Sequence, residues 1–431
     1  MRWASEIAAK LALWLFCALC VAAAVLLAFR QGLAAFEYSF PESIEIPQSL
    51  DPANSDYVKA EGDWLFRALI PPQSAAAKAR YRQALALNPF YYNHWIDWAE
   101  ANWRQGDDSP AEDALRMALR LAPNRHEALR IYGDFLLEKD LKKASFYHAA
   151  CIQLQPGAAR AIWPVYWALG WPATQTALAL LGQNPKLHQD HFREALAWID
   201  PDEAHSLWQA LSSIPQALDP PSYNAYFSYL IRHRNYEDAR SLWSEIAARH
   251  YGDLPGYKSN ENALFWNGDF ELPLRFAGGL EWQLPNSPPK GSVIAISAAR
   301  AANQDRSLWL HFDGKENVSG VLARHFFFVQ PEQAYRLEFH VNALGITTSN
   351  GPFVEVAVSG LQTERVRSEA AVGTGDWLQG LSFRAPADGH WAELTVQRQR
   401  SSKLDNKILG DAWYDDFVLE IVDTPLPDDA P

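Results

Sequence analysis

Two pairs of adjacent carboxylates have the residue types that acid–base chemistry would need. Asp415 and Asp416 lie in a run that alternates apolar and polar residues, which predicts a strand. Neighbours on a strand point to opposite faces of a sheet, so these two cannot act together on one glycosidic bond. Asp107 and Asp108 follow Gly106 and are expected to form a solvated loop and a helix cap.

The other potential ligands and nucleophiles are equally poor candidates for chemistry. His188 and His191 form an H-x-x-H pair, which we expect at the surface and not on a metal ion. Cys17 and Cys20 form a C-x-x-C within an uncharged run, where cysteine behaves as a small hydrophobic residue. The sequence contains no H-E-x-x-H, G-x-S-x-G, P-loop or glycine-rich dinucleotide motif. We therefore expect no enzyme, and we assign no catalytic or cofactor-binding residue.

Composition narrows the class of protein further. The chain has 431 residues, enough for two or three domains, with 51 acidic and 38 basic side chains and a net charge of −13. A strongly acidic chain argues against nucleic acid as a partner, because such binders normally carry a basic face. With only 3 cysteines, neither a disulfide scaffold nor a cysteine-based metal cluster is expected.

The elements that organise the chain begin with an uncharged run from Leu11 to Phe29, bracketed by Lys10 and Arg30. At 1.5 Å per residue a helix of this length just spans a hydrocarbon core of ~30 Å. A cleaved signal peptide is the alternative, but its apolar region is usually only ~7–15 residues long. We favour a retained anchor, with residues 1–36 as a cytoplasmic stub and transmembrane helix.

The orientation follows from the basic residues around this run. Arg2 and Lys10 precede it and Arg30 follows it, which places the N-terminus inside under the positive-inside rule. We therefore expect a single-pass inner (plasma) membrane protein. The bulk of its chain would be periplasmic or extracytoplasmic.

After a linker over residues 37–55, residues 56–252 carry Ala, Leu and aromatic residues at helical spacing. Pro89, Pro123 and Pro156 recur at intervals of 34 and 33 residues. Twelve and five positions before each proline stands a small residue, as two closely crossing helices would need. These residues are Ala77 and Ala84, Ala111 and Ala118, and Ala144 and Cys151.

This period, with its paired small residues and terminal proline, resembles the tetratricopeptide repeat. The resemblance is good over residues 56–170, then decays where Trp163-Pro164 and Trp171-Pro172 interrupt the helical pattern, and returns over residues 223–250. It implies an all-α array of helical hairpins whose surface binds a protein partner. Tyr92 and Trp103 are the aromatic residues that we expect to line the partner groove.

Beyond Pro255-Gly256 the pattern changes to short alternating runs separated by Gly, Pro, Asn and Asp. It predicts an all-β sandwich of jelly-roll type over residues 260–423, followed by an acidic, proline-rich tail over 424–431. The expected strands are 293–296, 307–312, 323–329, 335–341, 354–358, 378–383, 391–397 and 413–421.

Several short motifs in this region together resemble the galactose-binding-like superfamily of carbohydrate-binding modules. They are Phe265 to Glu271 (FWNGDFE), Trp282, Gly375 to Trp377 (GDW), Phe383 to Pro386 (FRAP) and Asp411 to Leu419 (DAWYDDFVL). The resemblance implies a possible structural calcium ion between the opening and closing strands, with Glu271 and Asp416 as the matching carboxylates. The alternative is that these two side chains cap turns or pair with arginine.

Two functions remain open at this stage. The first is a membrane-anchored, non-cytoplasmic interaction or scaffold protein, whose repeats bind a protein partner in cell-envelope or exopolysaccharide assembly. The alternative is a carbohydrate-binding or glycan-active protein that uses the C-terminal sandwich. Exposed tryptophans would favour a glycan, because a sugar face stacks on an indole ring. The tryptophans to locate are Trp282, Trp309, Trp377, Trp391 and Trp413.

Overall fold

The computed structural model describes residues 19–28, 31, 51–68, 74–255, 257, 264–298, 306–360 and 364–422. Its contacts divide the chain into two compact units, Met1–Leu187 and His188–Pro431. The sequence pattern changes from helical to alternating between residues 252 and 260, and the contacts group the last helices with the β-domain.

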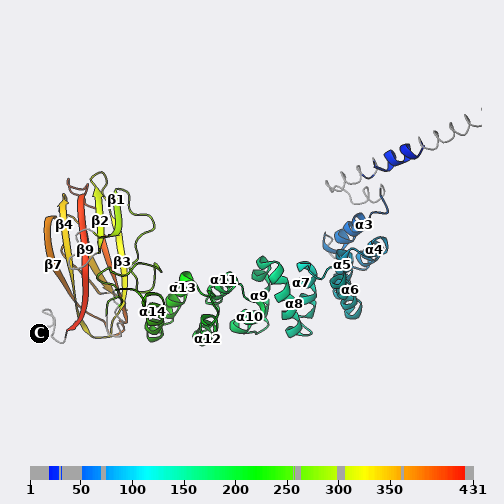
Figure 1. Cartoon of the computed structure of the whole chain (residues 1–431), viewed down its shortest axis with the longest axis horizontal. Helices are drawn as coiled ribbons and strands as arrows, with labels where there is room; N and C mark the ends of the chain where they lie inside the picture. Colours follow the sequence, from blue (N-terminus) through cyan, green and yellow to red (C-terminus); the bar gives the residue numbers. More distant parts are fainter. Residues whose placement is uncertain are drawn as a thin grey trace, which may run out of the picture. The chain divides into compact units, whose positions relative to one another are not determined.

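The first unit is an array of helices in which successive helices pack on one another (Figure 1). A π-helical turn, Trp64–Ala68, follows the helix Ser55–Asp63, and a 3₁₀ turn, Pro156–Ala158, precedes the helix Ala159–Ala168. The helices are α3 (Ser55–Asp63), α4 (Ser74–Leu87), α5 (Tyr92–Trp103), α6 (Asp108–Leu121), α7 (His126–Leu136), α8 (Leu141–Leu154), α9 (Ala159–Ala168) and α10 (Ala173–Leu180). The predicted helical repeat region is confirmed.

The small residues of the repeat lie where their spacing predicts. All six of them are 0% exposed, namely Ala77, Ala84, Ala111, Ala118, Ala144 and Cys151. A side chain no larger than a methyl or thiol group lets two helix backbones approach closely. The seam of this unit is therefore made of small side chains, with larger ones such as Leu115 and Phe135 packed beside it.

The predicted interruption at Trp163-Pro164 is wrong. Pro164 lies inside α9, which continues to Ala168. Proline removes one main-chain donor from a helix, but the buried side chains of Ile162, Trp163 and Tyr166 hold this one in place. Pro172, by contrast, does mark a boundary, because it directly precedes α10.

Four helices precede the β-domain: α11 (Pro185–Ala195), α12 (Pro201–Ser212), α13 (Pro220–Arg232) and α14 (Tyr236–Tyr251). Asp200 and Asp219 cap α12 and α13 by accepting from the N–H groups of Glu203 and Ser222. His188 and His191, which we expected at the surface, are buried at 1% and 0% exposure. Burial lowers the pKa of His191 to about 3, so this imidazole is neutral at pH 7.

The C-terminal part is an antiparallel β-sandwich of two sheets, with strand orders β1-β2-β9-β4-β7 and β3-β8-β5-β6. Eight of the strands lie where the sequence predicts them, and β6 was not expected. The strands are β1 (Ser292–Ser297), β2 (Ser307–Asp313), β3 (Gly320–Phe328), β4 (Ala334–Ile346), β5 (Phe353–Val358), β6 (Glu364–Arg367), β7 (Gly373–Arg384), β8 (Trp391–Arg398) and β9 (Leu409–Val422).

Large aromatic side chains fill the core between the two sheets. Trp282 is 0% exposed, and its ring centroid lies 4.8 Å from Phe270 and 5.0 Å from Phe417. Its Nε1–H donates to the carbonyl of Asn267 at 3.0 Å. Residues that are far apart in the sequence thus meet around one indole ring.

A buried carboxylate joins the end of helix α14 to the segment that opens the β-domain. Glu281 is 1% exposed and accepts the N–H groups of Arg275, Phe276 and Ala277 at 2.7–2.8 Å. The hydroxyl of Tyr251, at the end of α14, also donates to Glu281. The last helical hairpin and the sandwich are consequently one packed body.

Among the residues that the structure describes, no helix combines the length and apolar character that a membrane crossing requires. Residues 19–28 of the predicted anchor are helical and exposed. Residues 11–18 and 29 lie outside the described residues.

Candidate functional site

A groove of about 420 Å³ crosses the helices α6, α7 and α8 of the first unit. We call it the α6–α8 groove. Its lining comprises Glu112, Arg116, Leu119, Arg120, Tyr132, Leu136, Lys143 and Tyr147. A volume of this size lies within the range of small-ligand and peptide-anchor pockets, ~300–1,000 Å³.

Two tyrosines form the aromatic wall of the α6–α8 groove. The rings of Tyr132 and Tyr147 lie 4.6 Å apart at an angle of 55°. The hydroxyl of Tyr132 donates to Glu112 at 3.2 Å, and burial raises the pKa of Tyr132. The wall is therefore fixed by packing and by a hydrogen bond between helices.

The charges around this wall are mainly positive. Arg116 pairs with Glu112 at 2.6 Å, and Lys143 pairs with Asp140 at 3.4 Å. Arg120 forms no ion pair with any residue that the structure describes. Three cations and one carboxylate thus line the groove, against the negative charge of the whole chain.

The aromatic residues that the sequence suggested for a partner groove lie elsewhere. Trp103 packs on Phe135 in the helix core, with ring centroids 5.5 Å apart. Tyr92 is half-buried beside Tyr91 and under the guanidinium of Arg125, 5.9 Å from its ring. Neither residue lines the α6–α8 groove.

A sequence signal for the α6–α8 groove does exist. Glu112, Arg116 and Arg120 recur every four residues, which puts three charged side chains on one face of α6. The tyrosines carry no such signal, because buried and exposed aromatics look alike in a repeat. Only the packing of three helices brings the two kinds of side chain together.

The same unit contains a chain of hydrogen bonds that looks like a catalytic triad. The Oδ1 atom of Asp134 lies 3.1 Å from Nε2 of His148, whose Nδ1 lies 2.9 Å from the hydroxyl of Tyr166. Tyr166 is 0% exposed, however, and burial raises its pKa far above neutral. No substrate can reach this hydroxyl, so the network ties α7, α8 and α9 together and does not act as a nucleophile.

The two carboxylates suggested for calcium lie on segments that meet. The N–H of Phe417 donates to the carbonyl of Gly268 at 3.0 Å, so the opening segment runs beside β9. Glu271 accepts the N–H of Arg306 at 3.0 Å, and Asp416 has a left-handed backbone with φ of 51°. Within the described residues there is no group of three or more His, Cys, Asp or Glu side chains that could hold a metal. A calcium ion here would depend on main-chain oxygens.

The five tryptophans of the sandwich are not all buried. Trp282 and Trp413 are 0% and 6% exposed, whereas Trp377 on the edge strand β7 is 36% exposed. Trp309 and Trp413 are direct neighbours across β2 and β9, on the face opposite to the inward-pointing Leu308 and Leu310. Trp309 donates through Nε1 to Asp411 at 2.8 Å. The outer face of the larger sheet therefore carries the partly exposed indole of Trp309 beside a carboxylate, with Trp413 buried next to it.

No family model matches the sequence, and no curated protein matches it. Solved structures give partial likenesses. PilF of Pseudomonas aeruginosa has 18% identity over 47% of this chain and 94% of its own, with a TM-score of 0.27. The first TPR domain of human RPAP3 has 19% identity over 27% of this chain and 94% of its own, with a TM-score of 0.25.

A tailspike protein of bacteriophage CBA120 has 12% identity over 37% of this chain, with a TM-score of 0.27. The matched region spans only 21% of the length of that tailspike domain. At such scores these likenesses carry no argument. The description of this protein as helical repeats followed by a β-sandwich rests on its own helices and strands.

Proposed function

We propose that this protein is a non-catalytic interaction protein whose α6–α8 groove binds an acidic segment of a protein partner. The observation that carries the proposal is the combination, in one groove, of a fixed tyrosine wall with three cations. Aromatic residues and arginine carry much of the binding energy of protein interfaces. Tyrosine buries a large area at little entropic cost, and arginine offers several donors to a carboxylate. Arg120, which has no carboxylate partner in the described part of the chain, is the cation most available to a ligand.

The proposal extends to the location of the protein. The uncharged run 11–29 would anchor the chain in the inner membrane, with the repeats and the sandwich on the non-cytoplasmic side. A scaffold in cell-envelope or exopolysaccharide assembly fits an anchored chain that carries a binding array and no catalytic motif. Recovery of the full-length chain in the membrane pellet after a salt wash would support the anchor, and a soluble form starting near residue 35 would contradict it.

Site-specific photo-crosslinking tests the groove. A photoreactive phenylalanine analogue replaces Tyr147 in the full chain, and in a matched control it replaces Arg82, an exposed residue of α4 outside the groove. We expect a defined crosslinked protein from position 147 and none from position 82. The crosslinked segment should contain Asp or Glu beside an apolar residue.

Charge reversal then distinguishes the groove from a general sticky surface. Arg120→Glu should weaken binding of the identified segment by about 1–3 kcal/mol, as expected for a charged contact at an interface. Arg232→Glu, on a helix of the other unit, should leave it unchanged. Equal loss from both variants, or crosslinks of equal yield from positions 147 and 82, would contradict the proposal.

A second function, glycan binding by the sandwich, is favoured by one observation. Trp309 is partly exposed on the outer face of β2, with Asp411 and His311 next to it and the buried Trp413 packed beside it across β9. Indole faces and nearby carboxylates suit the apolar face and hydroxyl groups of a sugar. Glycan binding that is lost in Trp309→Ala and kept in Trp198→Ala would establish this function, while no binding to a glycan array would exclude it.

A structural calcium ion is part of the same proposal for the sandwich. Glu271 and Asp416 would supply carboxylate oxygens, and carbonyls of the adjoining segment would complete the ligand set. A chelator should then lower the melting temperature of the wild type but not that of Glu271→Gln. An unchanged melting temperature in the wild type would show that the sandwich holds no structural calcium ion.

A further inference from the structure

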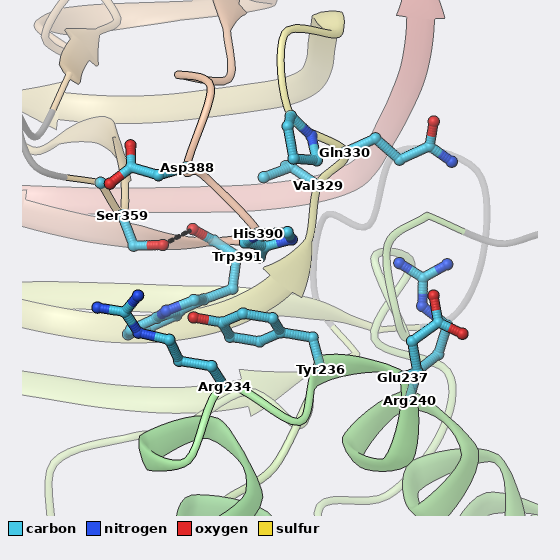
Figure 2. A pocket seen from close by; sticks show the side chains of 12 residues that line it. Arg234, Tyr236, Glu237, Arg240, Val329, Gln330, Ser359, Asp388, His390 and Trp391 are labelled. Atoms are coloured by element: carbon cyan, nitrogen blue, oxygen red, sulfur yellow. Dashed lines mark hydrogen bonds between the residues drawn. The ribbon is translucent and has the colours of Figure 1, made fainter.

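A second groove, of about 620 Å³, lies within the second unit where the turn between α13 and α14 faces three turns of the sandwich. We call it the α14 groove. Helix α14 and the residues before it contribute Arg234, Tyr236, Glu237 and Arg240. Figure 2 shows Tyr236 between Arg234 on one side and the side chains of Glu237 and Arg240 on the other. The functions proposed above make no use of this groove.

The two arginines are the feature that points to a ligand. Both are exposed, and neither makes a salt bridge or side-chain hydrogen bond with any residue that the structure describes. The guanidinium of Arg240 lies over the ring of Phe328 at 5.2 Å, which leaves its N–H groups free at the edge. The carboxylates of Glu237 and Asp388 also line the groove, so its lining carries two charges of each sign. The two guanidinium groups, which make no salt bridge with a described residue, are the groups that can pair with carboxylates of a ligand.

Arg234 occupies a position where glycine would be the easier residue. Its φ is 61°, and the N–H of Asn235 donates to the carbonyl of Leu230 at 2.9 Å, which closes the end of α13. A non-glycine residue in this conformation costs roughly 1 kcal/mol. An arginine at this strained position, at the rim of a groove, is consistent with selection for the side chain itself.

The floor of the α14 groove is aromatic and ordered. The rings of Tyr236 and His390 stack at 4.5 Å and 15°. Trp391 lies beside them, and its carbonyl accepts a hydrogen bond from the hydroxyl of Ser359 at 2.7 Å (Figure 2). The groove therefore offers apolar faces between its two arginines, as an acidic segment with proline or leucine would require.

Such a segment follows the last strand of this chain. Residues 423–431 read Asp-Thr-Pro-Leu-Pro-Asp-Asp-Ala-Pro, with three carboxylates and no cation, and lie outside the described residues. Strand β9 ends at Val422, whose carbonyl accepts from the amide of Gln333 at 3.4 Å. Gln333 belongs to the β3–β4 turn, which also supplies Val329, Gln330 and Pro331 to the groove.

We propose that the acidic segment 423–431 docks in the α14 groove of its own chain, with its aspartates on Arg234 and Arg240. The segment starts beside the β3–β4 turn that lines the groove, and an extended chain covers about 3.3 Å per residue. Proline favours an extended backbone in a free chain, which lowers the entropic cost of binding in an extended form. A short tether also gives an effective concentration in the millimolar range, so weak contacts suffice.

Hydrogen exchange measured by mass spectrometry tests this docking in the full chain kept in detergent. The full chain is compared with a chain that ends at Val422 and with the triple variant Asp423→Asn, Asp428→Asn and Asp429→Asn. We expect removal of the segment, or of its charges, to speed exchange at residues 233–241 and 329–333 by about two-fold or more. A two-fold change corresponds to a segment that occupies the groove about half of the time. Added salt should do the same to the full chain, since exposed ion pairs are screened.

Variants of the groove provide the matched control. Arg234→Gln with Arg240→Gln should reproduce the effect of truncation, whereas Arg249→Gln, in the last turn of the same helix, should not. Equal exchange in the full and the truncated chain would overturn the proposal. Protection that depends on protein concentration would overturn it too, because the segment would then come from a second copy.

Discussion

The cores of the helical repeats and of the sandwich are built on opposite principles. In the repeats one structural position recurs as Ala84, Ala118 and Cys151, each of them 0% exposed. In the sandwich Trp282 collects Phe270 and Phe417, which lie far apart along the chain. The first core depends on side chains small enough for helices to approach, and the second on side chains large enough to fill the space between two sheets. The repeats should thus be sensitive to added volume and the sandwich to lost volume.

The largest effect should come from removing volume in the sandwich. Trp282→Ala should destabilise the second unit by about 3–5 kcal/mol, since it leaves a large cavity and removes one of the two hydrogen bonds to the carbonyl of Asn267. Denaturant unfolding followed by circular dichroism measures this loss. Trp198→Ala, at a residue that is 79% exposed, is the matched control and should change stability by less than about 0.5 kcal/mol. Similar losses in both variants would show that the packing around Trp282 does not determine the stability of the second unit.

Adding one methyl group at a tight helix contact should lower the stability of the repeats. In Gly133→Ala the new Cβ would overlap the His148 ring, which hydrogen bonds to Asp134 and Tyr166 hold in place. We expect a loss of about 1–3 kcal/mol in thermal or denaturant unfolding, as for other overpacked sites. Gly157→Ala is the control, because its nearest neighbouring atom is 3.8 Å away. If Gly133→Ala were tolerated as well as Gly157→Ala, the repeat seam would be looser than its burial implies.

Acid should lower the stability of the sandwich through a buried histidine, and the loss per pH unit should be smaller than the losses from the substitutions above. Burial lowers the pKa of His325 from 6.5 to about 3, so the folded protein keeps this ring neutral. The unfolded chain binds a proton below pH 6.5, and stability therefore falls by up to about 1.4 kcal/mol per pH unit between pH 6.5 and pH 3. His191, with its pKa also lowered to about 3, adds a separate contribution of the same sign.

The variant His325→Gln isolates this contribution. Glutamine keeps a donor for the carbonyl of Trp266, which His325 contacts at 2.8 Å, but does not titrate. Urea unfolding at pH 7, 6, 5 and 4 should show a shallower pH dependence in the variant than in the wild type, by about one proton. Parallel curves for the two proteins would mean that His325 takes up its proton without unfolding.

The repeats were readable from the sequence because their signal is local. The positions of Pro89, Pro123 and Pro156 predict the ends of α4, α6 and α8 to within two residues. The same reasoning failed at Pro164, because burial of neighbouring side chains outweighs the loss of one main-chain donor. Alternation likewise predicted eight strands, but the four residues of β6 are too few and too polar to show a period.

The candidate sites were harder to predict, because each depends on contacts between distant elements. Tyr147 and Arg120 meet only after three helices have packed, so aromatic content alone led to Tyr92 and Trp103 instead. Arg234 looks like an ordinary turn residue until its positive φ and its place beside the sandwich are known. Sequence patterns thus identify helices and strands, while packing decides which exposed side chains share a groove.

The helices α13 and α14 are synthesised before the segment with Glu281, against which they pack. Glu281 lies 30 residues after Tyr251. Phe328 comes later still, and the centroid of its ring lies 6.1 Å from that of Phe227 in α13. The hairpin of α13 and α14 therefore leaves the ribosome before anything that covers its aromatic face, which includes Trp243. Until the opening segment of the sandwich emerges, this face is exposed to chaperones and to neighbouring nascent chains.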